Sequence, residues 1–191
     1  MIRFFTYAEH YVDLNATEAN FIKQHGRIRT YKKNDYYVMT GETRRNWCFV
    51  LQGLVAGVRY NHGHEQDLIW VAPPYDYFTG TKHTFSDSTA DMDIQMLRPS
   101  ELLELPLTHV RTARQQFPQL AEFFQILLHK QLLFAQNMLR IQKTNDGTHR
   151  YVEFRRRLPE LERLLTMHET CSLLNIGLST YKRGQQLFFK F

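Results

Sequence analysis

Only two cysteines, Cys48 and Cys171, occur among the 191 residues, and they lie far apart in the chain. This scarcity excludes a disulfide framework, a zinc finger and a cysteine-ligated iron–sulfur cluster. No apolar run reaches the roughly 18 residues that a membrane span needs. The first ten residues are interrupted by charge too early for a signal peptide. These absences predict a reduced cytoplasmic protein without a membrane partner.

Most of the chain carries no net charge, because its basic and acidic side chains are equal in number. Residues 1–139 carry 14 basic and 14 acidic side chains, whereas residues 140–191 carry 10 basic and 5 acidic ones. The whole excess of +5 therefore lies in the last quarter. A neutral body with a basic end is typical of a sensing part joined to a part that faces nucleic acid. The alternative is a solvated basic helix around residues 155–157.

Motifs that support enzyme chemistry are also missing. The chain contains no nucleophile elbow, phosphate loop or zinc-protease motif, so no catalytic residue is predicted. His62 and His64 resemble a cupin metal motif, but Leu68 and Ile69 occupy the positions of its glutamate, and neither can bind a metal. The two histidines therefore predict an exposed hairpin tip and no metal site, and a cupin-like enzyme is a minor alternative.

The hydrophobic content of 43% is that of an ordinary globular protein. Residues 8–25 are amphipathic and predict one helix that ends at Gly26. Between residues 27 and 105, short segments rich in β-branched and aromatic residues alternate with turn residues. Such a series predicts a β-sandwich or barrel. The expected strands cover residues 27–32, 36–39, 47–52, 55–60, 67–71, 93–97 and 102–105.

Residues 117–143 switch to a helical period with two adjacent apolar stripes. A single stripe would bury a helix against its own domain, so two stripes indicate two partners. We expect one stripe to pack on the β domain and the other on the same helix of a second subunit. The alternative is one wide core-facing stripe in a monomer. The second stripe runs through Ala121, Leu128, Leu132, Ala135 and Leu139. We assign the dimer interface to the first stripe, which contains Leu120, Phe124, Leu127, Phe134, Met138 and Ile141.

The chain ends in short helices separated by tight turns. A helix is expected at residues 148–157, and Thr166 with Glu169 fits a capping box that opens a second one. A turn at residues 176–177 follows, and Ser179 is expected to cap a last helix that runs through Gln186. Two helices joined by a short turn with glycine indicate a helix-turn-helix. Any two short helices joined by a glycine turn share this pattern.

The outward side of the last predicted helix carries hydroxyl, amine, guanidinium and amide groups. Such groups contact base edges and phosphates in the major groove of DNA. We therefore predict that DNA is bound by Ser179, Thr180, Lys182, Arg183 and Gln186.

Several short motifs follow one another in a familiar order. Residues 33–35 read Lys-Asn-Asp, residues 40–42 read Thr-Gly-Glu, and residues 49–55 read Phe-Val-Leu-Gln-Gly-Leu-Val. Residues 171–183 read Cys-Ser-Leu-Leu-Asn-Ile-Gly-Leu-Ser-Thr-Tyr-Lys-Arg. Over nearly its full length the chain resembles the Crp/Fnr superfamily of bacterial transcription regulators. It is most similar to the short form, which stops soon after the recognition helix.

This resemblance implies an α+β fold in three parts. Residues 1–116 would form a cyclic-nucleotide-binding-like β-roll (a jelly-roll double-stranded β-helix) with an N-terminal helix. Residues 117–143 would form a dimerisation helix, and residues 144–191 a helix-turn-helix DNA-binding domain. The implied protein is a cytoplasmic homodimer that binds double-stranded DNA. RNA polymerase and a small-molecule effector are its further implied partners.

Two departures from the family pattern change these expectations. Members that bind cyclic AMP carry a Gly-Glu pair and an Arg-Ser/Thr-Ala triplet, yet residues 75–96 hold no arginine and only one lysine, Lys82. A phosphodiester needs a bidentate cation, so cyclic AMP is not expected and no cofactor is predicted. Asn175 replaces the usual turn glycine and tolerates a positive φ. The remaining polar residues line a pocket for another effector or a vestigial pocket: Tyr77, Thr79, Gly80, Lys82, His83, Ser88 and Thr89.

A different class of function fits the same departures. The chain would then be an effector-binding or protein-interaction module with a degenerate C-terminus that does not bind DNA. Salt-dependent binding to duplex DNA separates the two interpretations. A regulator that contacts several phosphates releases their counterions, so its affinity for DNA falls steeply as the salt concentration rises.

Overall fold

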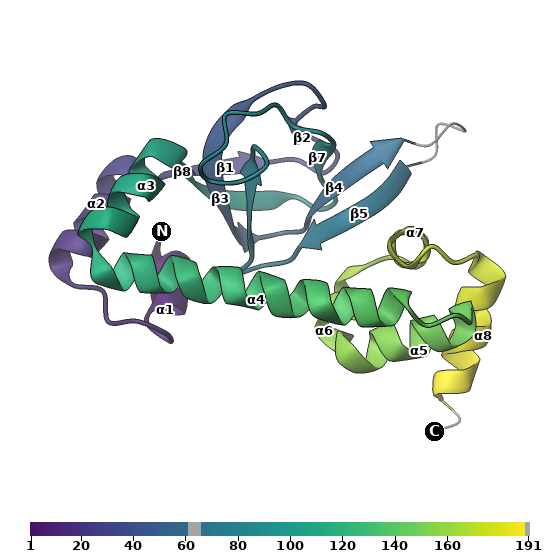
Figure 1. Cartoon of the computed structure of the whole chain (residues 1–191). Helices are drawn as coiled ribbons and strands as arrows, with labels where there is room; N and C mark the ends of the chain where they lie inside the picture. The colour runs from purple at the N-terminus through teal and green to yellow at the C-terminus, as the bar shows by residue number, and fades with distance from the viewer. Residues whose placement is uncertain (61–65, 190–191) are drawn as a thin grey trace. The chain divides into compact units, whose positions relative to one another are not determined.

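The computed structural model describes residues 1–60 and 66–189 (Figure 1). The chain forms two compact units. Unit 1 comprises Met1–Val58 and Val71–His129, and unit 2 comprises Arg59–Trp70 and Lys130–Phe191. Within the described residues, no helix combines the length and apolar composition that crossing a membrane would require. The predicted hairpin tip with His62 and His64 lies outside the described residues.

The strands form two four-stranded sheets, ordered β1-β8-β3-β6 and β2-β7-β4-β5. The pairs β1–β8, β3–β8, β3–β6, β2–β7 and β4–β7 are antiparallel. All seven predicted strands are present, and the sequence prediction missed only β6, a four-residue strand that follows two prolines. The bounds are β1 Arg27–Tyr31, β2 Tyr36–Val38, β3 Arg44–Gln52, β4 Val55–Tyr60, β5 Gln66–Ala72, β6 Tyr77–Gly80, β7 Asp93–Met96 and β8 Ser100–Pro106.

The turn motifs that carried the family resemblance adopt left-handed backbone conformations. Asn34 has φ 71°, Gly41 has φ 88° and Gly53 has φ 101°. A Cβ atom on Gly53 would lie 2.2 Å from the Ser100 hydroxyl oxygen, so only glycine fits there. These three turns therefore need the residue types that the sequence places in them.

The N-terminal region contains two helices, α1 (Ile2–Ala8) and α2 (Ala16–His25), where one helix over residues 8–25 was predicted. The prediction was wrong because Asn15 starts a new helix. Its side chain accepts hydrogen bonds from the Thr17 and Glu18 amides, and the Glu18 carboxylate accepts one from the Asn15 amide. This capping box starts α2 after seven non-helical residues, 9–15.

The core of unit 1 lies between one sheet face and helices α1, α2, α3 (Leu107–Gln116) and α4 (Pro118–Gln142). Trp47 and Phe49 of β3 face these helices, and the Trp47 ring meets Phe124 of α4 edge-on at 5.1 Å. Phe4 of α1 packs in the same way on Phe49 at 5.3 Å. Alternation along β3 sends Cys48 to the opposite face, which is the interior of the roll.

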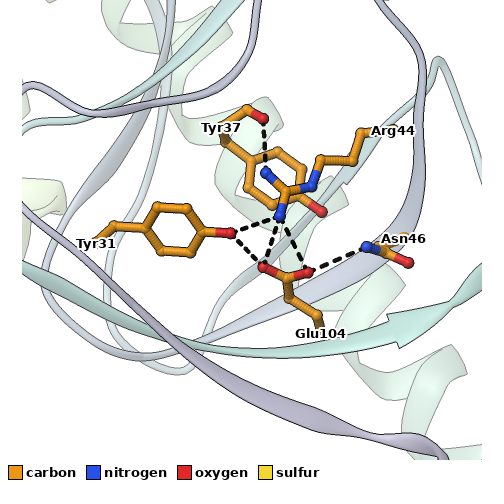
Figure 2. A network of polar contacts seen from close by, with 5 residues as sticks. All are labelled: Tyr31, Tyr37, Arg44, Asn46 and Glu104. Atoms are coloured by element: carbon orange, nitrogen blue, oxygen red, sulfur yellow. Dashed lines mark hydrogen bonds and ion pairs between the residues drawn. The ribbon is translucent and has the colours of Figure 1, made fainter.

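A polar network occupies that interior (Figure 2). The Glu104 carboxylate is buried and accepts hydrogen bonds from the Tyr31 hydroxyl, the Arg44 guanidinium and the Asn46 amide. Arg44 also donates to the Tyr37 carbonyl oxygen at 3.0 Å and lies 4.0 Å from the centre of the Tyr37 ring. The network therefore links β1, β2, β3 and β8, and it satisfies a buried charge with three donors.

Helix α4 shows which apolar stripe is available to a partner. Leu120, Phe124 and Leu127 belong to the core of unit 1, and Ile141 is fully buried in unit 2. Phe134 and Met138 are half-buried. Assignment of this stripe to the dimer interface is therefore wrong at the four buried positions. The second stripe is the exposed one, as its residues Leu128, Ala135, Leu132 (52% exposed) and Leu139 (57% exposed) show.

Unit 2 contains the C-terminal part of α4 and four helices. Helix α5 (Gly147–Arg157) packs on α8 (Leu178–Phe188), where the Tyr151 and Tyr181 rings meet edge-on at 4.6 Å. The Tyr151 hydroxyl donates to the Glu162 carboxylate of α6 (Pro159–Leu164). Burial is the larger cause that raises the pKa of Tyr151, and this hydrogen bond raises it further. The sequence prediction missed α6, α1 and α3.

Gly184 allows α8 to approach α5 closely. A Cβ atom there would lie 2.7 Å from a Tyr151 ring carbon and 3.1 Å from the Thr148 carbonyl oxygen. We expect Gly184→Val to lower the free energy of unfolding by about 2 kcal/mol, the cost of overpacking a tight core. Urea unfolding followed by circular dichroism measures the change. Gln186→Val is the matched control, since it places the same side chain at an exposed position of α8. Equal stability of the two variants would contradict this packing.

Candidate nucleic-acid interface

The helix-turn-helix consists of α7 (Met167–Leu174), a turn at residues 175–177, and α8. Thr166 caps α7 in the predicted capping box with Glu169. Asn175 has φ 50°, and the amides of Asn175 and Ile176 donate to the Ser172 and Cys171 carbonyl oxygens. This is a Schellman motif, and it ends α7 where asparagine replaces glycine at little cost.

Arg150 of α5 holds this turn in place. Its guanidinium donates to the Leu174 carbonyl oxygen at 2.9 Å and the Asn175 carbonyl oxygen at 3.3 Å. The same side chain donates twice to the Thr144 carbonyl oxygen at the end of α4. Arg150 therefore has a structural role: it links the end of α4 to the turn, and its guanidinium is hydrogen-bonded to backbone carbonyl groups of the same unit.

The structure exposes most of the predicted DNA-binding residues. Ser179, Lys182, Arg183 and Gln186 are all exposed on α8, and we call these four residues the α8 face. Thr180 is half-buried, and its methyl carbon lies 2.9 Å from where a Cβ atom on Gly147 would be. Thr180 therefore points toward α5 rather than outward. Its hydroxyl accepts a hydrogen bond from Arg183 at 3.3 Å.

Two details of α8 differ from the sequence prediction. Gly177 occupies the N-cap position and Ser179 lies in the first turn, so the prediction that Ser179 caps the helix was wrong. Leu178, the first residue of α8, is 40% exposed and borders the α8 face. The sequence reasoning did not include it because apolar residues were assigned to the core. Its position four residues before Lys182 indicates that it lies on the same side of the helix as Lys182.

Charge pairing separates two groups of cations in unit 2. Arg156 and Arg157 both form ion pairs with Glu153, and Arg155 lies 4.4 Å from the centre of the Phe188 ring. By contrast, among residues 1–60 and 66–189 no carboxylate forms an ion pair with Lys182 or Arg183. The basic run at residues 155–157 is therefore internally paired or stacked, whereas the α8 face carries two cations available for phosphate.

The predicted effector residues lie in different environments. Tyr77 packs on Trp47 in the helix-covered core with ring centres 5.6 Å apart, and burial raises the pKa of Tyr77 to about 12. Gly80 pairs with Arg44, whose carbonyl oxygen would lie 2.3 Å from an added Cβ atom. Lys82, His83 and Thr89 are exposed.

Hydroxyl groups in the same segment are used by local hydrogen bonds. The Thr79 hydroxyl donates to the Thr81 carbonyl oxygen at 2.7 Å, and Ser88 is hydrogen-bonded to Ser86. The His83 ring accepts a bond from the Phe85 amide at 3.1 Å. These bonds stabilise turns within the segment.

Arginines do reach this segment, but they come from α3. The Arg111 Nε atom donates to the Thr84 carbonyl oxygen at 2.9 Å. Arg111 and Arg114 also lie 5.6 and 5.7 Å from the centre of the Phe85 ring. The sequence prediction did not include these two arginines because they lie outside residues 75–96, on a helix that it did not predict. Among the described residues, no cluster of three or more His, Cys, Asp or Glu could hold a metal ion.

The comparisons with known proteins rest on structure. No family model matches the chain, and no curated protein matches it by sequence. The global regulator CLP of Xanthomonas campestris, described as responsive to c-di-GMP, has a TM-score of 0.69 and 14% identity, with 92% of each chain covered. A transcriptional regulator of the Crp/Fnr family from Eubacterium rectale has a TM-score of 0.66 and 13% identity, covering 93% of this chain and 85% of that one.

A third similar structure is a CooA mutant from Carboxydothermus hydrogenoformans. Its TM-score is 0.69 and its identity 17%, over 94% of this chain and 86% of that chain. The two four-stranded sheets, the long α4 and the helix-turn-helix occur in the predicted order, so the predicted fold class is confirmed. The chain therefore has the fold of the Crp/Fnr transcriptional regulators, with a cyclic-nucleotide-binding-like β-roll followed by a C-terminal helix-turn-helix.

Proposed function

We propose that this protein is a DNA-binding transcriptional regulator of the Crp/Fnr type and has no enzyme activity. The observation that carries the proposal is the α8 face, which places a hydroxyl, an ammonium, a guanidinium and an amide on the second helix of a helix-turn-helix. These groups suit phosphate oxygens and the acceptor-rich base edges of the major groove. RNA polymerase is the further partner included in the proposal.

A homodimer is part of the same proposal. The exposed stripe of α4 repeats at a heptad spacing through Leu128, Leu132, Ala135 and Leu139. Two such helices bury their stripes against each other in a coiled coil. A twofold dimer presents two recognition helices, which dock in successive major grooves about 34 Å apart. The dimer would therefore bury the exposed stripe and set the distance between the two recognition helices that contact the two half-sites.

We further propose that the effector is not cyclic AMP, and that the roll binds a different small molecule or none. Three observations support this part. The segment at residues 75–96 lacks arginine, and the hydroxyl groups of Thr79 and Ser88 form local hydrogen bonds. Arg44, the cation inside the roll, is already paired with the buried Glu104 carboxylate. A bound effector would act by shifting the two α4 helices and hence the spacing of the recognition helices.

A fluorescence-anisotropy titration with random duplex DNA at several salt concentrations tests DNA binding. We expect the logarithm of the affinity to fall linearly with the logarithm of salt concentration. Lys182→Ala and Arg183→Ala should each weaken binding by about tenfold and reduce the salt slope by about one, because each removes a phosphate-facing charge.

Arg156→Ala is the matched control. It also removes one positive charge from unit 2, but this arginine is paired with Glu153 at 2.8 Å. We expect its salt slope to equal that of the wild type. If the wild-type protein shows no salt-dependent binding to duplex DNA, the regulator proposal fails and the interaction-module interpretation replaces it.

A further inference from the structure

Leu178 is the apolar residue at the border of an otherwise polar α8 face. It is the first residue of α8, it is 40% exposed, and it lies one turn before Lys182. The buried side of the helix is formed instead by Tyr181 and Gly184. Burial of α8 against its own domain therefore does not require a large apolar side chain at position 178.

The start of α8 is also open to close approach. Gly177 contributes no side chain, and a Cβ atom built there would meet nothing within 4 Å. In helix-turn-helix proteins, the N-terminal residues of the second helix contact base edges while the rest of the helix lies along the groove. If α8 enters the groove, Leu178 is thus placed at the depth where bases are read.

The major groove offers one apolar group to such a side chain, namely the C5-methyl group of thymine. We propose that Leu178 packs on a thymine methyl group and so selects a thymine in each half-site of the operator. This inference rests on the proposed function. Arg183 lies five residues further on, about 7.5 Å along the helix axis, so its phosphate contact is separate from the contact of Leu178 with the bases.

Replacement of thymine by deoxyuridine tests the inference, because it removes only the methyl group. An operator is first selected from a random duplex library with the wild-type protein, and each of its thymines is then replaced in turn. Burial of one methyl group corresponds to roughly a fourfold change in affinity. We expect the wild type to lose about fourfold at one thymine per half-site, and Leu178→Ala to bind thymine and deoxyuridine duplexes equally there.

Two variants control for folding and for the loss of any exposed leucine. Leu164→Ala removes a leucine of similar exposure, 38%, from α6, and it should keep the wild-type preference for thymine. Leu178→Met retains an apolar side chain and should also keep it. The thermal unfolding midpoint shows whether each variant is folded.

The outcomes separate this inference from the proposed function. If Leu178→Ala keeps the wild-type ratio of thymine to deoxyuridine affinity at every position, the thymine contact is overturned while DNA binding stands. If the wild type binds duplexes with salt dependence but loses no affinity on any replacement, the thymine contact is overturned as well. If neither protein binds any duplex, both proposals fail.

Discussion

Leu132→Glu is expected to convert the proposed dimer into monomers, with a dissociation constant raised at least about 100-fold. The substitution removes two leucines from the seam, one from each subunit, and each is worth about 1.5–3 kcal/mol of burial. It also places two like charges close together across a twofold interface. Sedimentation velocity over a range of protein concentrations measures the change.

Leu133→Glu is a closely matched control. Leu133 is 60% exposed, and it lies about 100° around the helix from Leu132 and therefore outside the heptad seam. We expect this variant to stay dimeric. Dissociation of the Leu133 variant with retention of the Leu132 dimer would place the subunit interface on another face of α4. Loss of the dimer should also weaken operator binding, because a monomer contacts one half-site only.

Arg44→Ala is expected to lower the free energy of unfolding by about 3 kcal/mol. The substitution leaves the Glu104 carboxylate, whose side chain is 7% exposed, without its cation in the roll interior. Breaking a buried ion pair by removing one partner costs about 3–5 kcal/mol, and the lower end applies because Arg44 itself is 35% exposed. Urea unfolding followed by tryptophan fluorescence is the measurement, since Trp47 lies in the adjacent core.

Two further variants make this test specific. Arg45→Ala breaks an exposed ion pair with Asp87, so its effect should stay below about 1 kcal/mol. Adding Glu104→Gln to Arg44→Ala should recover part of the lost stability, because a neutral amide needs no cation. Equal effects of Arg44→Ala and Arg45→Ala would show that the network in Figure 2 does not stabilise the roll.

The boundaries that the sequence missed have local physical causes. α3 follows β8 directly at Leu107, and its N-cap residue is Pro106, whose side chain cannot accept a capping hydrogen bond. The break at residues 9–15 depends on the Asn15 capping box, which is readable in sequence as Asn-x-x-Glu but is hidden by a continuous amphipathic pattern. Short elements of this kind gain most of their stability from tertiary packing, so propensity alone locates them poorly.

Local sequence patterns predict seven of the eight strands in the described residues, the long helix, the helix-turn-helix with its capping box, and the polar side of the last helix. These features follow from local rules, namely period, turn chemistry and capping, which act over a few residues. Packing between distant segments sets which α4 stripe is exposed, because both stripes satisfy the same heptad pattern and only the first contains the buried Leu120, Phe124 and Leu127. Packing also turns Thr180 inward, leaves Leu178 exposed, and places Arg155 against the Phe188 ring. Those outcomes depend on contacts between residues far apart in the chain, which no local pattern specifies.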